Sequence, residues 1–208
     1  TVHHSVLKPF PTRRSYDLLI QPDLFLRVRP GNNKRVTGKL AGAGLQYRLI
    51  NENCVSLPNS SKINDVLELD KEAVVQDYNS QRVGELIQLS IANCQLPISI
   101  WDCCAASGGK SIMAYDINPE IELTVSDKRE SILENLKKRF AKAGIKKYNS
   151  FVADLSSPPP LEEAGRRFDF IICDAPCTGS GTWARTPDQL FYFKKDSIEK
   201  YAALQKKI

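Results

Sequence analysis

From Pro97 onward, apolar runs typical of strands alternate with amphipathic segments typical of helices, and this alternation limits the fold more than any other feature. We expect strands at 98–105, 121–127, 148–154 and 168–174, and helices at 107–117, 129–144 and 195–208. Strands that alternate with helices form a parallel sheet with right-handed crossover connections. The sequence therefore predicts an α/β domain built on a parallel sheet.

Each of these strands ends in or beside an acidic residue: Asp102, Asp127, Asp154 and Asp174. Ligands of open parallel sheets bind at the carboxyl ends of the strands. Aspartates after strands also cap helices and begin turns, but four of them in register favour a ligand with hydroxyls, an amine or a positive centre. S-adenosylmethionine carries all three in its ribose, its adenine and its ammonium group.

The turn between the first strand and its helix, "DCCAASGGKS", follows neither of the common nucleotide-binding patterns. It lacks the spacing of G-x-G-x-x-G. Residues 108–111 imitate the end of the phosphate loop G-x-x-x-x-G-K-[ST], but the first glycine of that loop is missing. Without it the backbone amides cannot close around a phosphate. A nucleotide triphosphatase is therefore disfavoured.

The positive charge of the chain is concentrated near its N-terminus. Residues 1–50 hold nine Lys and Arg against two Asp, a net charge of +7, so the other residues total −2. Strand-like segments at 24–30, 46–50 and 54–58 and a helix-like segment at 33–45 predict a small α+β module over residues 1–70. An amphipathic helix is expected at 79–93. A basic module suggests a surface for a polyanion, although a solvated lysine-rich surface would have the same charge.

The six cysteines do not indicate a disulfide framework, because two are adjacent and most lie in apolar contexts. The spacing of Cys173 and Cys177 fits no zinc pattern, and only His3 and His4 supply imidazoles, so we expect no metal. No apolar stretch reaches the ~18 residues of a membrane span, and the first residues lack the core of a secretory signal. These features predict a cytoplasmic protein.

Two motifs resemble those of the RNA 5-methylcytosine methyltransferases of the RsmB/NOP2/Sun family. "DCCAASGGK" is similar to the family's D-x-C-A-A-P-G-G-K, and "DAPCTGSGTWARTPD" is similar to its D-A-P-C-S-G-x-G with a trailing R-x-P-D. The resemblance covers roughly residues 20–208. It implies a Rossmann-like class I S-adenosylmethionine-dependent methyltransferase domain over 71–208, preceded by an RRM-like RNA-binding module.

The resemblance also implies roles for individual residues. Around the methionine end and the ribose of S-adenosylmethionine it places Cys104, Ala105, Ala106, Ser107, Gly108, Gly109 and Lys110. Asp127 would accept hydrogen bonds from the ribose, Asp154 would approach the adenine amine, and Asp174 would stand beside the methyl group and the target base. The implied partner is RNA, most simply ribosomal RNA with a single-stranded or flipped cytosine. Its expected contacts are Arg27, Arg29, Lys34, Arg35 and Arg185.

Methylation of cytosine at C5 requires a thiol, because C5 becomes nucleophilic only after a thiolate adds to C6. In the family, the cysteine after D-A-P assists product release, and the attacking cysteine lies in a T-C-S motif on the next strand. That motif is absent from these 208 residues, so we expect a fragment of a longer protein. Cys177 is then the release-assisting thiol, or the nucleophile if no later cysteine exists. Cys173 should be core, and one of Cys103 and Cys104 should face the cofactor.

Two alternatives stay open. A noncatalytic RNA-binding protein with a curtailed methyltransferase fold would also lack T-C-S, and the replacements of the family's proline by Ser107 and of its arginine by Ile132 weaken the expected cofactor contacts. A methyltransferase acting on an exocyclic amine would usually place an aromatic residue where Cys177 stands. The sequence does not show the oligomeric state, the particular RNA or the cytosine.

Overall fold

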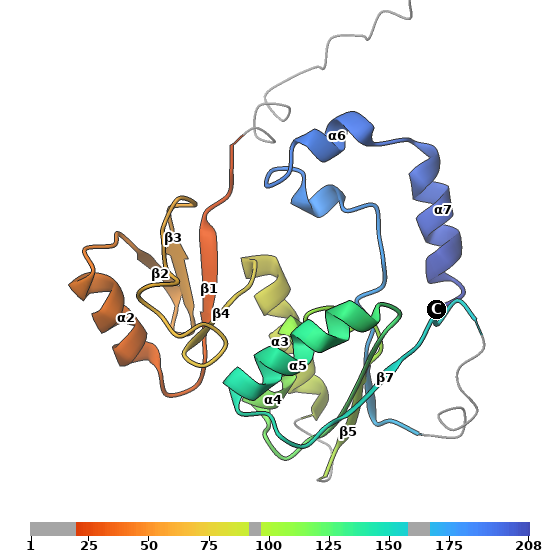
Figure 1. Ribbon diagram of the computed structural model, residues 1–208, viewed down its shortest axis with the longest axis horizontal. Coiled ribbons are helices and arrows are strands. Elements are labelled where there is room, and N and C mark those ends of the chain that lie inside the picture. Colours follow the sequence, from red (N-terminus) through yellow and green to blue (C-terminus); the bar gives the residue numbers. More distant parts are fainter. Residues whose placement is uncertain (1–19, 92–96, 158–166) are drawn as a thin grey trace, which may run out of the picture.

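Two separate four-stranded sheets organise the chain (Figure 1). The computed structural model describes residues 20–91, 97–157 and 167–208. One sheet belongs to the N-terminal module and is antiparallel, and the other is parallel. This arrangement confirms the predicted α/β class with a small α+β module before it.

The N-terminal sheet has the strand order β2-β3-β1-β4. Its strands are β1 (Leu24–Val28), β2 (Arg48–Asn51), β3 (Cys54–Leu57) and β4 (Ala73–Val75). The helix α2 (Asn33–Gly42) packs on it through Val36 and Leu40, which are fully buried against strand residues such as Leu26. The first three strands and the helix were predicted, whereas β4 was not. Because β4 pairs with β1, the sheet extends past the expected boundary at residue 70 to Val75.

The second sheet is parallel throughout and has the order β7-β6-β5-β8. Its strands are β5 (Ser99–Asp102), β6 (Glu122–Asp127), β7 (Asn149–Val152) and β8 (Phe170–Ile172). The chain runs outward from β5 through β6 to β7 and then returns to place β8 on the other side of β5. The strand order therefore switches between β5 and β8, and ligands of such sheets bind at the carboxyl ends beside this switch.

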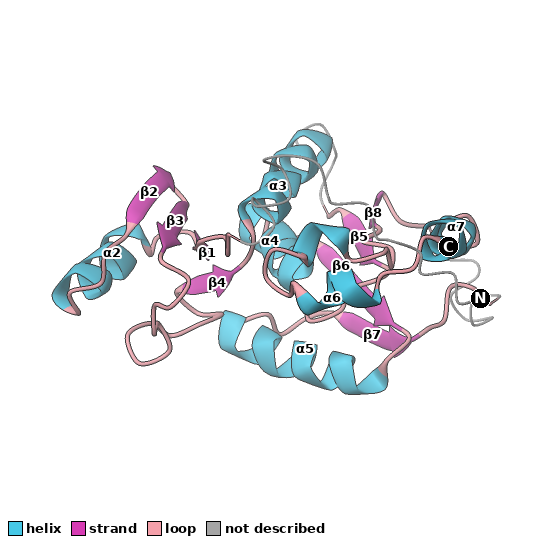
Figure 2. Ribbon diagram, turned by 90° about the horizontal axis from the view of Figure 1, so that it is seen from above, coloured by secondary structure: helices cyan, strands magenta, loops and turns pink. Residues whose placement is uncertain are grey.

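Helices α3 (Tyr78–Ile91), α4 (Gly109–Ile117) and α5 (Glu130–Ala143) pack together with this sheet (Figure 2). The core joins Ile100 and Val125 of the strands to Ile112 of α4 and Phe140 of α5, all fully buried. The amphipathic face of α5 was predicted, and Gly144, in the left-handed conformation at φ +77°, ends the helix as expected. Burial of these apolar side chains is the main source of stability for the fold.

The last part of the chain forms a 3₁₀ turn (Ser180–Thr182), a short helix α6 (Asp188–Tyr192) and the predicted helix α7 (Asp196–Gln205). Figure 1 shows this segment rising from the end of β8 to α6 at the top of the view and then descending through α7 toward the end of β7. Gln205 donates a hydrogen bond to the carbonyl oxygen of Pro176 at 2.9 Å. That contact ties α7 to the loop that follows β8. In the part of the chain that the structure describes, no helix combines the length and apolar character needed to cross a bilayer.

Two buried arginines at the end of β1 connect the N-terminal module to the second domain. Arg27 lies in β1 and Arg29 directly follows it. Their side chains point to the same side, as predicted, but both are about nine-tenths buried and both form ion pairs with Asp116 of α4. Arg29 also donates to the carbonyl oxygen of Ala143 at the end of α5, at 2.8 Å. The expectation that these two arginines contact RNA is therefore wrong, because their donors are used to hold the N-terminal module against the second domain.

Candidate active site

A cleft of about 390 Å³ lies at the carboxyl edge of the parallel sheet. Its volume is within the range of ligand pockets. It gathers six of the residues expected to form the site: Cys104, Ala106, Asp127, Asp154, Asp174 and Cys177. They come from the ends of all four strands, which is why their separation in the sequence does not keep them apart. The predicted site residues thus share one cleft in the folded chain.

The turn between β5 and α4 is packed too closely for a side chain at Gly108. This glycine has φ +82°, and a Cβ atom there would lie 2.8 Å from Cε1 of Phe140 and 3.0 Å from Cγ of Leu136. The turn is closed by a hydrogen bond from the N–H of Gly108 to the carbonyl oxygen of Ala105, at 2.8 Å. Gly108 therefore lets the turn press onto α5, and this contact sets the position of Ala106 at the cleft.

Asp127 is a buried carboxylate that is held in place by the β5–α4 turn and by the residues just after β6. It accepts hydrogen bonds from the backbone N–H of Ala106 at 3.1 Å and from the N–H and Nε of Arg129, each at 3.0 Å. Burial alone would raise the pKa of Asp127, but these hydrogen bonds outweigh it and lower the pKa. The group is thus an anion at neutral pH, suited to accept hydrogen bonds from ligand hydroxyls.

Asp102 differs from the other strand-end acids, because it does not line the cleft. Its Oδ2 accepts a hydrogen bond of 2.6 Å from the hydroxyl of Ser111, a residue of α4. Its Oδ1 is buried and has no partner among the described residues. Burial raises its pKa to about 6. Three of the four strand-end acids therefore share the cleft. The fourth, Asp102, accepts a hydrogen bond from the first turn of α4.

Asp174 and Cys177 form the wall that follows β8. Asp174 is exposed and makes an ion pair with Lys110 at the start of α4, at 2.5 Å. The thiol of Cys177 is exposed and accepts a long hydrogen bond, 3.5 Å, from the N–H of Gly179. Tyr201 and Leu204 of α7 complete this side of the cleft. A carboxylate and an accessible thiol, three residues apart in the chain, thus meet at one opening.

Several residues of the β5–α4 turn expected to bind the cofactor do not line the cleft. These are Ala105, Ser107, Gly108, Gly109 and Lys110. Ser107 accepts hydrogen bonds from Arg139 of α5 through its carbonyl oxygen and its hydroxyl, at 2.8 and 2.9 Å. In this structure the five residues shape and anchor the turn, and direct cofactor contact by them stays a prediction.

Residues that were not predicted also line the cleft: Lys128, Arg129, Ala153, Leu155, Pro176, Tyr201, Leu204 and Ile208. Arg129 and Lys128 follow the strand-end Asp127 directly, so the same pattern that identified the acid could have identified them. Tyr201 and Leu204 lie on α7, and their approach depends on how the segment after β8 folds back. Nothing in their local sequence indicates it.

The cysteines are placed partly as expected. Cys103 is buried and Cys104 is half-buried, but both line the cleft, so the expected division, with one thiol facing the core and the other the cofactor, is not found. Cys173 is exposed, so its assignment to the core is wrong. It lies just beyond β8, the outermost strand on its side of the sheet, and no described strand covers it. Cys94 lies outside the described residues.

The remaining residues expected to contact RNA lie in two places. Lys34 and Arg35 are exposed on α2, which both overall views show on the far side of the N-terminal module from the parallel sheet (Figures 1 and 2). Arg185 forms an ion pair with Asp77 and donates to the carbonyl oxygen of Asp23 at 3.1 Å. It therefore fastens the loop after β8 to the N-terminal module.

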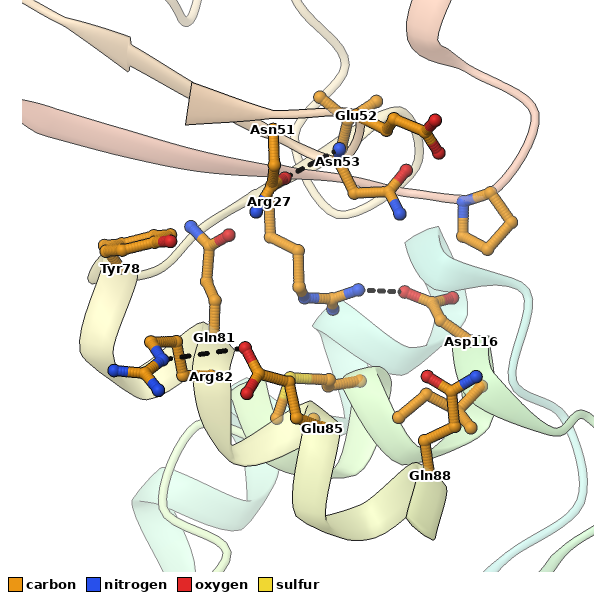
Figure 3. A pocket seen from close by; sticks show the side chains of 15 residues that line it. Arg27, Asn51, Glu52, Asn53, Tyr78, Gln81, Arg82, Glu85, Gln88 and Asp116 are labelled. Atoms are coloured by element: carbon orange, nitrogen blue, oxygen red, sulfur yellow. Dashed lines mark hydrogen bonds and ion pairs between the residues drawn. The ribbon is translucent and has the colours of Figure 1, made fainter. Parts of the chain in front are cut away.

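A second hollow, of about 610 Å³, separates β1 from α3 and α4 (Figure 3). Arg27 points across it from β1 toward Asp116, and Arg82 pairs with Glu85 on its α3 wall. Neither a cysteine nor any of the strand-end aspartates lines it. Its chemistry is that of an interface between the two domains, and the candidate active site is the smaller cleft.

A family model described as 16S rRNA methyltransferase RsmB/F matches residues 86–208 of this chain. Ribosomal RNA small subunit methyltransferase B of Xanthomonas campestris pv. campestris is 30% identical over 135 residues, which cover 64% of this chain and 30% of that protein. The enzyme of the same name from Pasteurella multocida is 28% identical over 196 residues, covering 90% of this chain and 43% of that protein. The chain thus spans less than half the length of these relatives.

Two solved structures share the fold. The structure of PH0851 has a TM-score of 0.77 at 21% identity, covering 90% of this chain and 42% of that one. NSun6 from Pyrococcus horikoshii, solved with SFG, has a TM-score of 0.74 at 14% identity, covering 92% and 72%. At these identities the likeness concerns the class I methyltransferase fold. Since the family model matches more than half of the residues, the chain belongs to the 16S rRNA methyltransferase RsmB/F family.

Proposed function

We propose that this protein methylates C5 of a cytosine in RNA, most simply in ribosomal RNA, with S-adenosylmethionine as the methyl donor. The observation that carries the proposal is the shared cleft. Asp174 and the accessible thiol of Cys177 open onto the same space as Asp127 and Asp154. A methyl donor held by the strand-end acids would therefore lie beside a carboxylate and a thiol, the groups that C5 chemistry requires.

The residues of the cleft fit S-adenosylmethionine, which supplies an electrophilic methyl group when bound. Asp127 is an anion preorganised by Ala106 and Arg129, and we assign it to the ribose hydroxyls. We assign Asp154, exposed after β7, to the adenine amine. The ion pair between Lys110 and Asp174 fixes the carboxylate that would face the target base. Each group offers acceptors where the cofactor offers donors.

The thiol chemistry gives Cys177 its proposed role. A thiolate adds to C6 of cytosine and forms an S–C6 bond, which makes C5 nucleophilic enough to take the methyl group. Loss of the C5 proton to a base then restores the ring and breaks the S–C6 bond, releasing the thiolate. We assign Cys177 to the release step, with the attacking thiol supplied by the family's T-C-S motif, which residues 1–208 do not contain.

RNA is the proposed partner, and the cytosine must be single-stranded or flipped to enter the cleft. Lys34 and Arg35 remain candidates for phosphate contacts on the N-terminal module, because both are exposed. Their distance from the parallel sheet (Figure 1) assigns them to RNA away from the target base. Arg185 would contact RNA only by exchanging its ion pair with Asp77. A cytoplasmic location stays a prediction.

The test uses the full protein that contains this sequence, with and without Cys177→Ala, on unmethylated ribosomal RNA. If Cys177 assists release, the variant accumulates a covalent protein–RNA adduct that survives denaturing electrophoresis. If Cys177 is the nucleophile, the variant forms neither adduct nor product. The matched control, Cys54→Ala, removes a buried thiol of the N-terminal module and should methylate normally. Unchanged methylation by Cys177→Ala would contradict the proposal.

A further inference from the structure

Three thiols of the second domain lie together at the switch between β5 and β8. The sulfur atoms of Cys103, Cys104 and Cys173 are all within 4.8 Å of one another. The parallel pairing of β5 with β8 causes this proximity. Asp102 is paired with Ile172, and the N–H of Cys103 donates to the carbonyl oxygen of Ile172 at 3.0 Å, so Cys103 and Cys173 leave the sheet side by side.

The cluster can be reached from two sides. Cys103 and Cys104 line the cleft of the candidate active site. Cys103 and Cys173 line a separate hollow of about 580 Å³ beside Trp101 and Ile171. The side chain of Cys173 is exposed, whereas that of Cys103 is buried. An ion could therefore enter from the hollow, and a position on the ion would remain open toward the cleft.

We propose that Cys103, Cys104 and Cys173 form a three-thiolate binding site for one divalent thiophilic metal ion, zinc(II) in the first instance. Three sulfur ligands select soft or borderline ions. The Zn–S distance of about 2.3 Å places two sulfurs of a tetrahedral site about 3.8 Å apart. Sulfurs already within 4.8 Å reach that spacing by small side-chain rotations. Three protein ligands leave the fourth position for water or a ligand in the cleft.

Charge favours a divalent ion over copper(I). Three thiolates with zinc(II) leave one negative charge, whereas three thiolates with copper(I) leave two. The carboxylate of Asp127 lines the same cleft as Cys103 and Cys104, so the smaller negative charge costs less in this environment.

Local sequence spacing predicted no metal site, because the three ligands do not form a short C-x-x-C pattern. The adjacent Cys103 and Cys104 are joined by Cys173 only through strand pairing. Of the three, only Cys104 stands at the cysteine position of the family motif quoted above. The proposal does not depend on the methylation proposed above, since it concerns the affinity of three thiols for an ion.

The experiment titrates cobalt(II), as a spectroscopic substitute for zinc(II), into the full protein kept reduced. The expected result is one equivalent bound with a thiolate-to-cobalt charge-transfer band, displaced by an equivalent of zinc(II). Cys173→Ala removes an exposed ligand at low risk to folding and should weaken binding by at least about a hundredfold, more than loss of an outer-shell partner does. Cys177→Ala and Cys54→Ala each remove one thiol outside the cluster and should keep the band.

Alkylation gives a second readout that needs no variant. Zinc(II) should protect the peptides of Cys103, Cys104 and Cys173 from iodoacetamide, with Cys177 still modified. The proposal is overturned if wild-type protein shows no charge-transfer band, if Cys173→Ala binds as tightly as wild type, or if Cys177→Ala loses the band equally. Protection of Cys177 in place of the cluster would also contradict it.

Discussion

Arg29, which directly follows β1, and Asp116 of α4 are joined by two hydrogen bonds, from Nε at 2.9 Å and from Nη2 at 2.7 Å, although 87 residues separate them. Asp116 also accepts from Arg27, at 2.5 Å. One carboxylate thus pairs with two buried arginines at the boundary between the N-terminal module and the second domain. Two of the nine basic residues whose combined charge suggested a polyanion surface are therefore structural.

Replacing Asp116 should destabilise the protein strongly. Asp116→Ala leaves two buried guanidinium groups without their carboxylate, and breaking a buried pair in this way costs about 3–5 kcal/mol. The free energy of unfolding in urea measures the effect. The control is Glu68→Ala, which removes an exposed ion pair with Lys71 and should cost less than about 1 kcal/mol. Equal losses in the two variants would refute the structural role of Asp116.

The turn at Gly108 should not tolerate a side chain. Gly108→Ala forces a left-handed φ on a non-glycine residue, which costs about 1–2 kcal/mol, and it drives a Cβ into Phe140. We expect a clearly lower melting temperature and weaker binding of S-adenosylhomocysteine. Gly109→Ala has no neighbouring atom within 4 Å of the added Cβ and lies in the first turn of α4, so its stability should equal or exceed that of wild type. The prediction fails if the two substitutions are equally tolerated.

Stability should fall at acid pH partly through Glu72. Burial would raise the pKa of Glu72, but hydrogen bonds from Nζ of Lys39 and from the N–H of Glu68 outweigh burial and lower it. A carboxylate whose pKa is lowered by folding stabilises the protein above its unfolded pKa of 4.5, and this contribution disappears as the pH falls through the folded value.

Glu72→Gln should therefore flatten the decline in unfolding free energy below pH 4.5, and urea titrations at several pH values measure it. Glu68→Gln changes an exposed carboxylate and should leave the decline in place. If the free energy of unfolding declines below pH 4.5 as steeply in Glu72→Gln as in wild type, another group is responsible for the decline.

Asp127 should contribute directly to cofactor affinity. Hydrogen bonds to a charged group are worth about 1.5–3 kcal/mol, so Asp127→Ala should weaken the binding of S-adenosylhomocysteine by about tenfold to a hundredfold in calorimetry. Asp169→Ala is the matched control, since Asp169 precedes β8 at the opposite edge of the same sheet, where it accepts from Ser99. Similar affinities for the two variants would place the cofactor elsewhere.

The helices and strands that could be predicted from the sequence are those with a local periodic pattern of apolar residues. The helix α5 has apolar residues at helical spacing, and the parallel strands are short apolar runs that end in acids, so each could be identified alone. Strand β4, with three residues, has no room for an alternating pattern. It forms because β1 offers a free edge for pairing.

The site was predictable where topology alone positions a residue. Parallel strands bring their carboxyl ends to one edge, so Asp127, Asp154 and Asp174 could be grouped without a structure. Asp102 has the same local signature, but Ser111 holds it inside the domain. The partner of Arg29 on α4 and the approach of Cys173 to Cys103 depend on contacts between distant segments, and single-sequence patterns carry no signal for them.

Identification of the methylated nucleoside tests whether this protein methylates C5 of cytosine. The full protein is incubated with unmethylated ribosomal RNA and S-adenosylmethionine labelled in its methyl group, and the RNA is digested to nucleosides for mass spectrometry. The expected result is label in 5-methylcytidine. Label in a nucleoside methylated on an exocyclic amine, or RNA that is bound but left unlabelled, would contradict it.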